Sequence, residues 1–435
     1  MRSQRRVIMT MCCRAAALLA ASGLPWPAVA EFNAPKYLNY EAGRLLIQPQ
    51  FDASVQYTDN LFYAPRSAAP GTPAASIPVA SDFIFTLSPG VELQYGRNKE
   101  RNIELEAFFD ELLYSKYSSF DSPQVRGAME VHWEFGRFVL QGTDSIGWLN
   151  QILGGQTATV YRAPIRTLVW NDNYRLTYDA TMKTDVYVVL NHNEQSFLQN
   201  VSLYSQNSVV GSLGSTYKPF ERLGFFLEGE GGYTGINAAS PSLPSASPST
   251  IYGGFVGARG NFTARLDGSI KAGYEVREFS SAANVANTPS PAAGVALTYT
   301  ESSRRSYILS FDRSVGVSVQ VPDQAYVFDN LAFTFTQGMG SSGRWTLQAQ
   351  PSLIMGNYTS IYRQVGASLV DFARNDQTYT MSVTMSYQPN AWLKASVNYT
   401  FQAYSAELPD PQAAQLVGVN NYLVNRVTLQ LSIGY

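Results

Sequence analysis

The 435-residue chain is poor in the residues on which many functions depend. It has two cysteines, two histidines and only 15% charged residues, whereas about a quarter of an average soluble chain is charged. Beyond its first thirty residues it also lacks an apolar run of the roughly 18 to 20 residues that a membrane-spanning helix needs. The 13% of aromatic residues argues against disorder, because such residues bury surface when a chain folds. An all-β chain, soluble or membrane-embedded, remains.

The N-terminus has the features of a secretory signal peptide. Four arginines flank the start of a short apolar stretch, Ala15–Leu24, and Ala28–Ala30 offers a small-x-small cleavage site before Glu31. We therefore expect residues 1–30 to be a cleaved signal peptide and residues 31–435 to form a single outer-membrane barrel domain. Both cysteines lie in the predicted signal peptide, so the mature chain would have no disulfide. It would carry 27 basic and 33 acidic residues, and this acidic balance excludes an electrostatic attraction to nucleic acid.

The mature sequence alternates between apolar and polar residues over long stretches. The segment Phe83–Tyr95 keeps a period of two, with one break at Ile84, and this period indicates a β-strand with one apolar face. Strands of ordinary sandwiches have a usual length of about five or six residues. Tilted strands that cross a bilayer need about nine to eleven, so the long alternation favours a membrane barrel.

Two further segments support the membrane interpretation. In Tyr379–Tyr387 one face begins and ends with tyrosine and is aliphatic in between, as expected for a barrel wall between two aromatic girdles. The last segment continues this pattern to the C-terminal residue and resembles the signal that the barrel assembly machinery reads during insertion. The residues of this predicted assembly signal are Val427, Leu429, Leu431, Ile433 and Tyr435. The assembly machinery and outer-membrane lipid are therefore the expected partners of the barrel.

Connections that look short alternate with long ones along the chain. Gly136 and Pro389–Asn390 mark short turns, whereas Asn237–Pro248 and Asn357–Asp376 are long segments rich in small and polar residues. Bacterial barrels have an even number of strands, short periplasmic turns and longer outer loops. We count about eighteen strands, with sixteen as the alternative. The predicted fold is all-β, a single closed antiparallel transmembrane β-barrel in the bacterial outer membrane.

The opening of the mature chain carries a family resemblance. Gln56–Phe62, Ser81–Gly90 and Tyr114–Asp121 follow one another in an order and spacing that resembles the start of outer-membrane β-barrel porins often encoded near polysaccharide-synthesis genes. The resemblance covers about the first ninety mature residues. It implies the barrel and its location more than it implies a substrate.

Residue patterns for catalysis are missing. His132 and His192 are the only histidines, and neither lies in a recognisable hydrolase site. The chain has no phosphate-binding loop, dinucleotide-binding glycine pattern or histidine metal motif. We therefore expect neither an enzyme nor a bound cofactor or metal.

The polar strand faces are the expected functional surface, because they would line the lumen of a barrel. The candidates for this lining are Asp52, Glu92, Glu104, Glu106, Asp110, Glu228, Glu230, Asp267, Lys271, Glu275, Lys394 and Arg426. Any barrel carries polar groups on the face turned away from lipid, so the alternative is that these residues only solvate the lumen, with pairs such as Asp267 and Lys271 neutralising each other. Because acidic candidates outnumber basic ones, an open lumen would prefer cations.

The sequence thus predicts a porin-like channel for the passive diffusion of small hydrophilic solutes. Two alternatives have the same fold. One is the barrel component of a polysaccharide export system, and the other is a structural or adhesive barrel with no open pore. No residue pattern selects the solute, the constricting loop or the oligomeric state.

Overall fold

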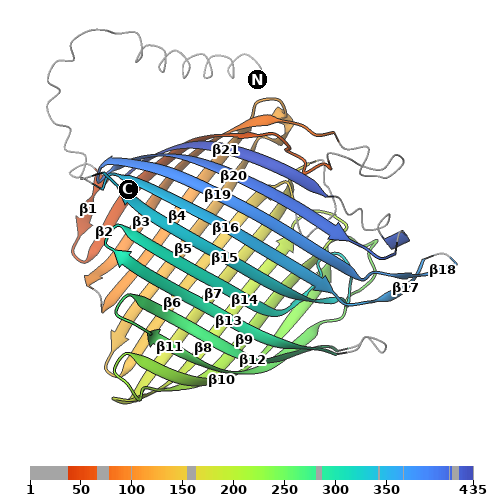
Figure 1. Cartoon of the computed structure of the whole chain (residues 1–435). Helices are drawn as coiled ribbons and strands as arrows, with labels where there is room; N and C mark the ends of the chain where they lie inside the picture. The colour runs from red at the N-terminus through yellow and green to blue at the C-terminus, as the bar shows by residue number, and fades with distance from the viewer. Residues whose placement is uncertain are drawn as a thin grey trace, which may run out of the picture. The chain divides into compact units, whose positions relative to one another are not determined.

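The computed structural model describes residues 38–65, 78–98, 100–153, 163–280, 287–340, 343–365, 367–410, 412–413 and 421–434. The predicted signal peptide and Tyr435, the last residue of the predicted assembly signal, lie outside this range. Strands dominate the described residues (Figure 1). None of the helices among these residues is long and apolar enough to cross a membrane.

The main sheet of the described residues is antiparallel and has 19 strands. One of them, β1 (Tyr40–Ala42), pairs only with the start of β2. The other eighteen strands form the wall, and each pairs with the next along the chain: β2 (Leu45–Thr58), β3 (Asp82–Asn98), β4 (Arg101–Tyr114), β5 (Ser122–Phe135), β6 (Phe138–Gln151), β7 (Ile165–Thr181), β8 (Thr184–Phe197), β9 (Tyr204–Tyr217), β10 (Leu223–Ala238), β11 (Ser249–Asn261), β12 (Leu266–Phe279), β13 (Thr288–Ser302), β14 (Arg305–Val317), β15 (Ala325–Met339), β16 (Trp345–Tyr358), β19 (Arg374–Asn390), β20 (Leu393–Glu407) and β21 (Tyr422–Ile433). Because β2 pairs with both β3 and β21, the sheet closes on itself. The predicted closed barrel of eighteen strands is confirmed.

The predicted alternation of short and long connections is also present. Gly136 lies between β5 and β6 with a φ of 66°, a left-handed conformation that glycine adopts without steric cost. The short turns lie at one end of the barrel, together with β1 and the end of β21, and the long connections lie at the other (Figure 1). These are called the short-turn end and the long-loop end below.

The long segment Asn357–Asp376 was expected to be a loop, and this prediction is wrong in part. β16 extends to Tyr358 and β19 begins at Arg374, and between them β17 (Tyr362–Val365) and β18 (Ser368–Asp371) form a separate two-stranded sheet. Strands of four residues are far shorter than the roughly nine that cross a bilayer. Their alternation is therefore too brief to be recognised in the sequence.

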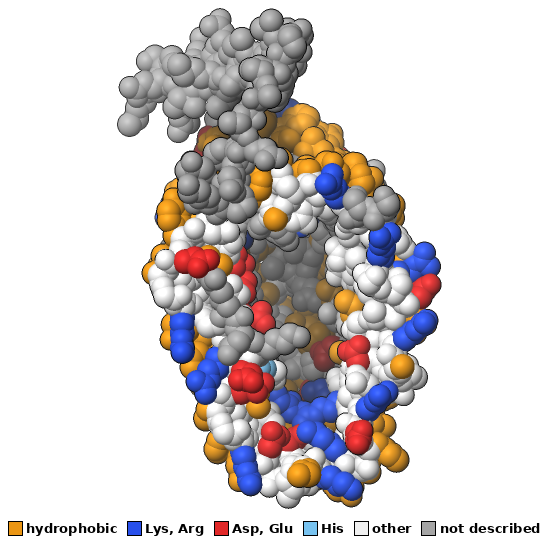
Figure 2. All heavy atoms as spheres, turned by 90° about the vertical axis from the view of Figure 1, so that its left-hand side faces the viewer, with side chains coloured by type: hydrophobic (Ala, Val, Ile, Leu, Met, Phe, Trp, Pro, Cys, Tyr) orange, Lys and Arg blue, Asp and Glu red, His pale blue; other side chains and the backbone are white. Residues whose placement is uncertain are grey.

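Burial follows the period of two in the wall. On β21, Leu429 and Leu431 are 49% and 43% exposed, whereas the neighbouring Ser432 is 8% exposed. On β19, Tyr379 and Met385 lie on the exposed face and Thr378 on the buried one. Apolar side chains cover the outer flanks of the barrel seen from its short-turn end, and charged side chains surround the opening (Figure 2). The sequence period thus separates an apolar exterior from a polar interior.

Candidate functional site in the barrel lumen

Two wall strands separate near the long-loop end. β13 and β14 are paired from Ser302 and Arg305 up to Ala293 and Arg313, and no further. Beyond this point β13 has the sequence Thr288–Pro289–Ser290–Pro291. The carbonyl of Pro291 accepts a hydrogen bond from Nε of Arg313 on β14 (3.2 Å), so this edge of β13 faces β14. Proline has no N–H to donate to a neighbouring strand, and the two prolines therefore end the ladder.

Freed from β13, the end of the β14–β15 hairpin turns into the lumen and lies over β12. Glu275 and Arg277 of β12 hold it there. The carboxylate of Glu275 accepts the N–H of Val315 (3.1 Å), and the carbonyl of Val315 accepts Nε and Nη2 of Arg277 (3.1 and 2.9 Å). Arg277 is only 5% exposed and also donates to Thr234 and Ser249. These four hydrogen bonds all end on neutral oxygens, which satisfies the donors of a buried guanidinium.

The connection between β14 and β15, residues 318–324, extends across the long-loop end of the lumen. On one side the amide of Tyr204 on β9 donates to the carbonyl of Val319 (2.8 Å). On the other side Arg374 of β19 donates to the side chain of Gln320. Gln324 adds two hydrogen bonds to backbone carbonyls of the segment between β16 and β19 (2.8 Å each). We call residues 314–328 the inward hairpin, and its contacts extend from β9 to β19.

Asp323 fixes the tip of the inward hairpin. Its φ is 60°, in the left-handed region that aspartate tolerates better than most residues. Its carboxylate accepts the amide of Ser247 (2.6 Å) and lies 3.6 Å from Arg363. Val321 packs with Val370, Phe372 and Ala413 in a small apolar cluster. Polar and apolar contacts together hold the tip against three other long connections.

Three of the sequence-predicted lumen residues come together near the short-turn end. Glu92 of β3 and Glu104 and Glu106 of β4 have carboxylate oxygens within 4.8 Å of one another. Gln50 of β2 donates to Glu92 (2.6 Å), and none of the three carboxylates forms a salt bridge with another described residue. We call them the carboxylate trio. At this separation their negative charges add up over a small part of the wall.

Other predicted carboxylates are paired with cations. Asp110 lies 3.0 Å from Nε of Arg126, and Asp52 lies 4.0 Å from Nη2 of the same side chain. Nζ of Lys271 on β12 lies 3.9 Å from Glu228 of β10, and no salt bridge joins Lys271 to Asp267 in the described part of the chain. The suggested neutralisation of Asp267 by Lys271 is therefore wrong, because residues four apart on one strand are separated by about 13 Å.

The remaining candidates occupy various positions on the wall. Glu230 is half-buried, Asp267 is exposed beside the turn between β11 and β12, and Lys394 pairs in register with Ser432. Arg426 of β21 stacks on the ring of Tyr63 at 5.1 Å. A role for these residues in permeation stays a prediction.

Sequence reasoning missed most of the basic residues in the lumen. Arg126, Arg175, Arg259, Arg277 and Arg374 lie on inner faces and contact inner-face partners. For two of them the signal was available, because Arg126 and Arg175 directly follow or precede an exposed apolar residue, Val125 and Leu176. The lumen therefore carries both signs of charge, and Figure 2 shows red and blue side chains on different parts of the opening.

Both histidines have polar partners on the wall. His192 Nδ1 lies 3.1 Å from Asp172, and His132 Nε2 lies 3.1 Å from Glu134. Gln141 also contacts His132 (3.3 Å). Neither contact brings a hydroxyl nucleophile to the histidine ring, which is the arrangement that a serine hydrolase needs.

Comparison with known proteins adds little to the fold described above. No protein-family model matches the chain, and no curated protein matches it. Among solved structures, OpdO of Pseudomonas aeruginosa is 8% identical, with a TM-score of 0.44 over 89% of this chain and 97% of that one. OccAB3 of Acinetobacter baumannii is 9% identical, with a TM-score of 0.40 over 89% and 98%. OccK2 (OpdF) of P. aeruginosa, in complex with glucuronate, is 8% identical, with a TM-score of 0.40 over 89% and 98%.

None of these matches tests the resemblance to porins encoded near polysaccharide-synthesis genes, which stays a prediction. At these identities the similarity of this chain to solved outer-membrane barrels concerns the fold alone.

Proposed function

We propose that this protein is an outer-membrane channel for small hydrophilic solutes, with the inward hairpin as its constriction. The observation that carries the proposal is the combination of an apolar outer face, a lumen lined with charges, and a hairpin held inside the lumen by buried polar contacts. Backbone groups in a bilayer must be satisfied internally, and a closed barrel achieves this. A soluble sheet gives no reason for an exposed apolar face around the whole wall.

We also propose a direction for the ion preference. Asp52, Asp110 and Glu228 have basic neighbours, so they contribute little net potential to the lumen. The carboxylate trio is not neutralised in this way and is the proposed source of any preference for cations. This preference is expected to be weaker than the sequence count of acidic residues implies.

Recording from the purified barrel in a planar bilayer tests the proposal. A channel gives steady conductance without any other protein. A barrel that works in polymer export would need partners to open, and an adhesive barrel would give no conductance. Reproducible absence of conductance from correctly folded protein would exclude the channel.

A salt gradient in the same recording tests the ion preference. The zero-current potential should indicate cation preference at low salt and approach zero at 1 M salt, where the Debye length is about 3 Å. The double substitution Glu104→Gln, Glu106→Gln should reduce the preference. Glu41→Gln, which removes one carboxylate from β1, is the control and should leave the potential unchanged. Anion preference in the unmodified protein would contradict the role of the trio.

A further inference from the structure

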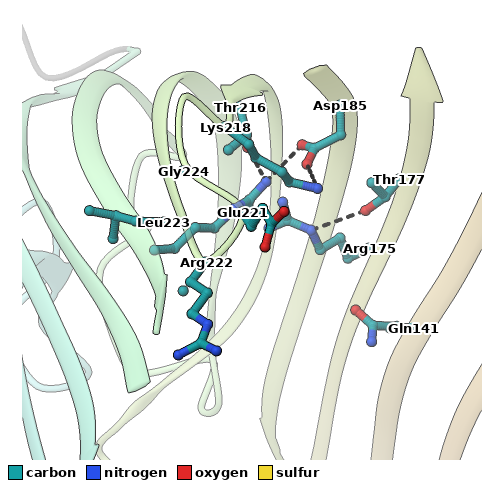
Figure 3. A pocket seen from close by; sticks show the side chains of 12 residues that line it. Gln141, Arg175, Thr177, Asp185, Thr216, Lys218, Glu221, Arg222, Leu223 and Gly224 are labelled. Atoms are coloured by element: carbon teal, nitrogen blue, oxygen red, sulfur yellow. Dashed lines mark hydrogen bonds and ion pairs between the residues drawn. The ribbon is translucent and has the colours of Figure 1, made fainter. Parts of the chain in front are cut away.

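A cavity of about 450 Å³ lies inside the short-turn end of the barrel, on the part of the wall formed by β6 to β11 (Figure 3). Four basic and two acidic side chains line it: Arg175, Lys218, Arg222, Arg259, Asp185 and Glu221. Its volume is in the range of about 300 to 1,000 Å³ that is usual for small-molecule sites. The basic excess makes an anion the expected occupant.

The two acidic residues differ in what they neutralise. Asp185 is 3% exposed, and its carboxylate lies 2.9 Å from Nη2 of Arg259 and 3.1 Å from Nζ of Lys218. This buried carboxylate therefore forms ion pairs with two of the four basic side chains, Arg259 and Lys218. Glu221 is exposed and forms no ion pair with another described residue. Arg175 and Arg222 thus remain without a carboxylate partner among the described residues.

Arg175 is the better placed of these two, because the wall holds it in position. Its guanidinium carbon lies 3.6 Å from the ring centroid of Tyr187, and Nε donates to Thr177 (3.3 Å). Its two terminal nitrogens have no hydrogen-bond partner in the part of the chain that the structure describes. Figure 3 shows the side chain beside Thr177, inside the group that lines the cavity.

Tyr187 is a rigid support for this arginine. The ring is fully buried, and its hydroxyl donates to Glu228 of β10 (2.9 Å). It lies against Gly214 of β9, where an added Cβ would be 2.3 Å from the ring carbon Cζ. Glycine at this position lets the ring lie against the wall, and Arg175 and Arg259 both stack on it. An arginine held in this way loses little side-chain entropy when it binds a ligand.

From this geometry we infer that the cavity binds a small solute through a carboxylate, with Arg175 as the main contact. Two parallel N–H donors of a guanidinium match the two oxygens of a carboxylate. Lys218 and Arg222 add positive charge around the site, and Gln141 and Thr177 offer neutral hydrogen-bonding groups. This inference rests on the proposed function and deepens it, because it names the class of solute that would bind inside the channel.

Binding of succinate to the purified barrel in detergent tests the site without requiring conduction. Isothermal titration should show saturable binding of succinate and none of succinamide, which has the same shape but no charge. Arg175→Gln should weaken binding roughly tenfold to a hundredfold, because a charge-assisted bidentate contact is lost. Arg175→Lys keeps the charge but not the two-donor geometry, so it should also weaken binding clearly.

Arg265→Gln is the matched control, since Arg265 lies in the neighbouring turn at the same end and outside this cavity. It should change succinate binding less than twofold. Equal losses in Arg175→Gln and Arg265→Gln would overturn the site in favour of general attraction. Phosphate binding as tightly as succinate would overturn the carboxylate assignment. Saturable succinate binding by a barrel that does not conduct would contradict the proposed channel and leave the site supported, whereas conduction without succinate binding would do the reverse.

Discussion

The inward hairpin can be tested by removing one side chain that holds it. Arg277→Met keeps most of the length of the side chain and removes all of its donors. Two of the lost hydrogen bonds end on the carbonyl of Val315 and connect the wall to the hairpin, and the other two join wall residues. Hydrogen bonds from charged groups contribute about 1.5 to 3 kcal/mol. We take about 2 kcal/mol for the pair, because both share one acceptor.

A loss of about 2 kcal/mol changes the ratio of released to inward hairpin roughly 30-fold, since 1.4 kcal/mol corresponds to a factor of ten. Contacts of Val319 with Tyr204 and of Gln320 with Arg374 remain, so the inward state should stay the main one. Because the two lost hydrogen bonds must break before the hairpin is released, their loss should raise the rate of release. The expected result is therefore brief steps to higher current that occur roughly 30 times more often than in the unmodified channel.

Single-channel recording measures the frequency of these steps directly. Arg265→Met removes an exposed arginine from the turn before β12 and serves as control, with an expected frequency equal to that of the unmodified protein. Retention of the shift between boiled and unboiled samples on a denaturing gel would show that each variant is folded. If Arg277→Met and Arg265→Met give the same step frequency as the unmodified channel, the hairpin is not a mobile constriction held by Arg277.

Three other predictions follow from the wall. The double substitution Pro289→Val, Pro291→Val restores two backbone N–H donors on β13, so pairing with β14 should extend and the inward hairpin should move outward. A larger unit conductance would support this expectation, and an unchanged conductance would contradict it. Val383→Arg should lower the amount of assembled protein in the outer membrane, because a charge at mid-membrane on the lipid face costs about 2 to 4 kcal/mol, whereas Thr384→Arg on the inner face should be tolerated. Equal amounts of the two variants would mean that the faces are assigned wrongly. The unmodified protein should sediment with outer membrane, and recovery from the soluble periplasm would refute the predicted location.

The strands of the wall could be predicted from the sequence because the alternation that marks each strand lies within that strand. A period of two, read within one strand, assigns Leu429 outward and Ser432 inward without knowledge of any other strand. The inward hairpin could not be predicted in this way. Its strands alternate like those of the wall, and the cause of its departure lies in Pro289 and Pro291 of the preceding strand. Only their pairing in space shows that the two prolines face β14.

Charge pairing in the lumen could not be predicted for a similar reason. Alternation places Asp185 and Arg259 on inner faces, but it does not show that an arginine on β11 extends to a carboxylate on β8. Contacts across several strands depend on wall curvature and on the space that glycines such as Gly214 leave open. The sequence therefore predicts which faces carry charge, whereas the structure is needed to show which charges remain unpaired.

The pairing of β2 with β21 has a consequence for the order of assembly. Asn425 donates to the carboxylate of Asp59 from both its backbone and its side-chain nitrogen (2.7 Å each), across 366 residues of chain. Contacts between such distant residues form late, because the entropy of closing a long loop is lost before the contact can stabilise the product. Until β21 docks, every partly assembled sheet keeps two open edges that can pair with other chains. The growing barrel must therefore be shielded at both edges until its last strand is in place, and a chain that loses β21 should aggregate even though the other seventeen wall strands are intact.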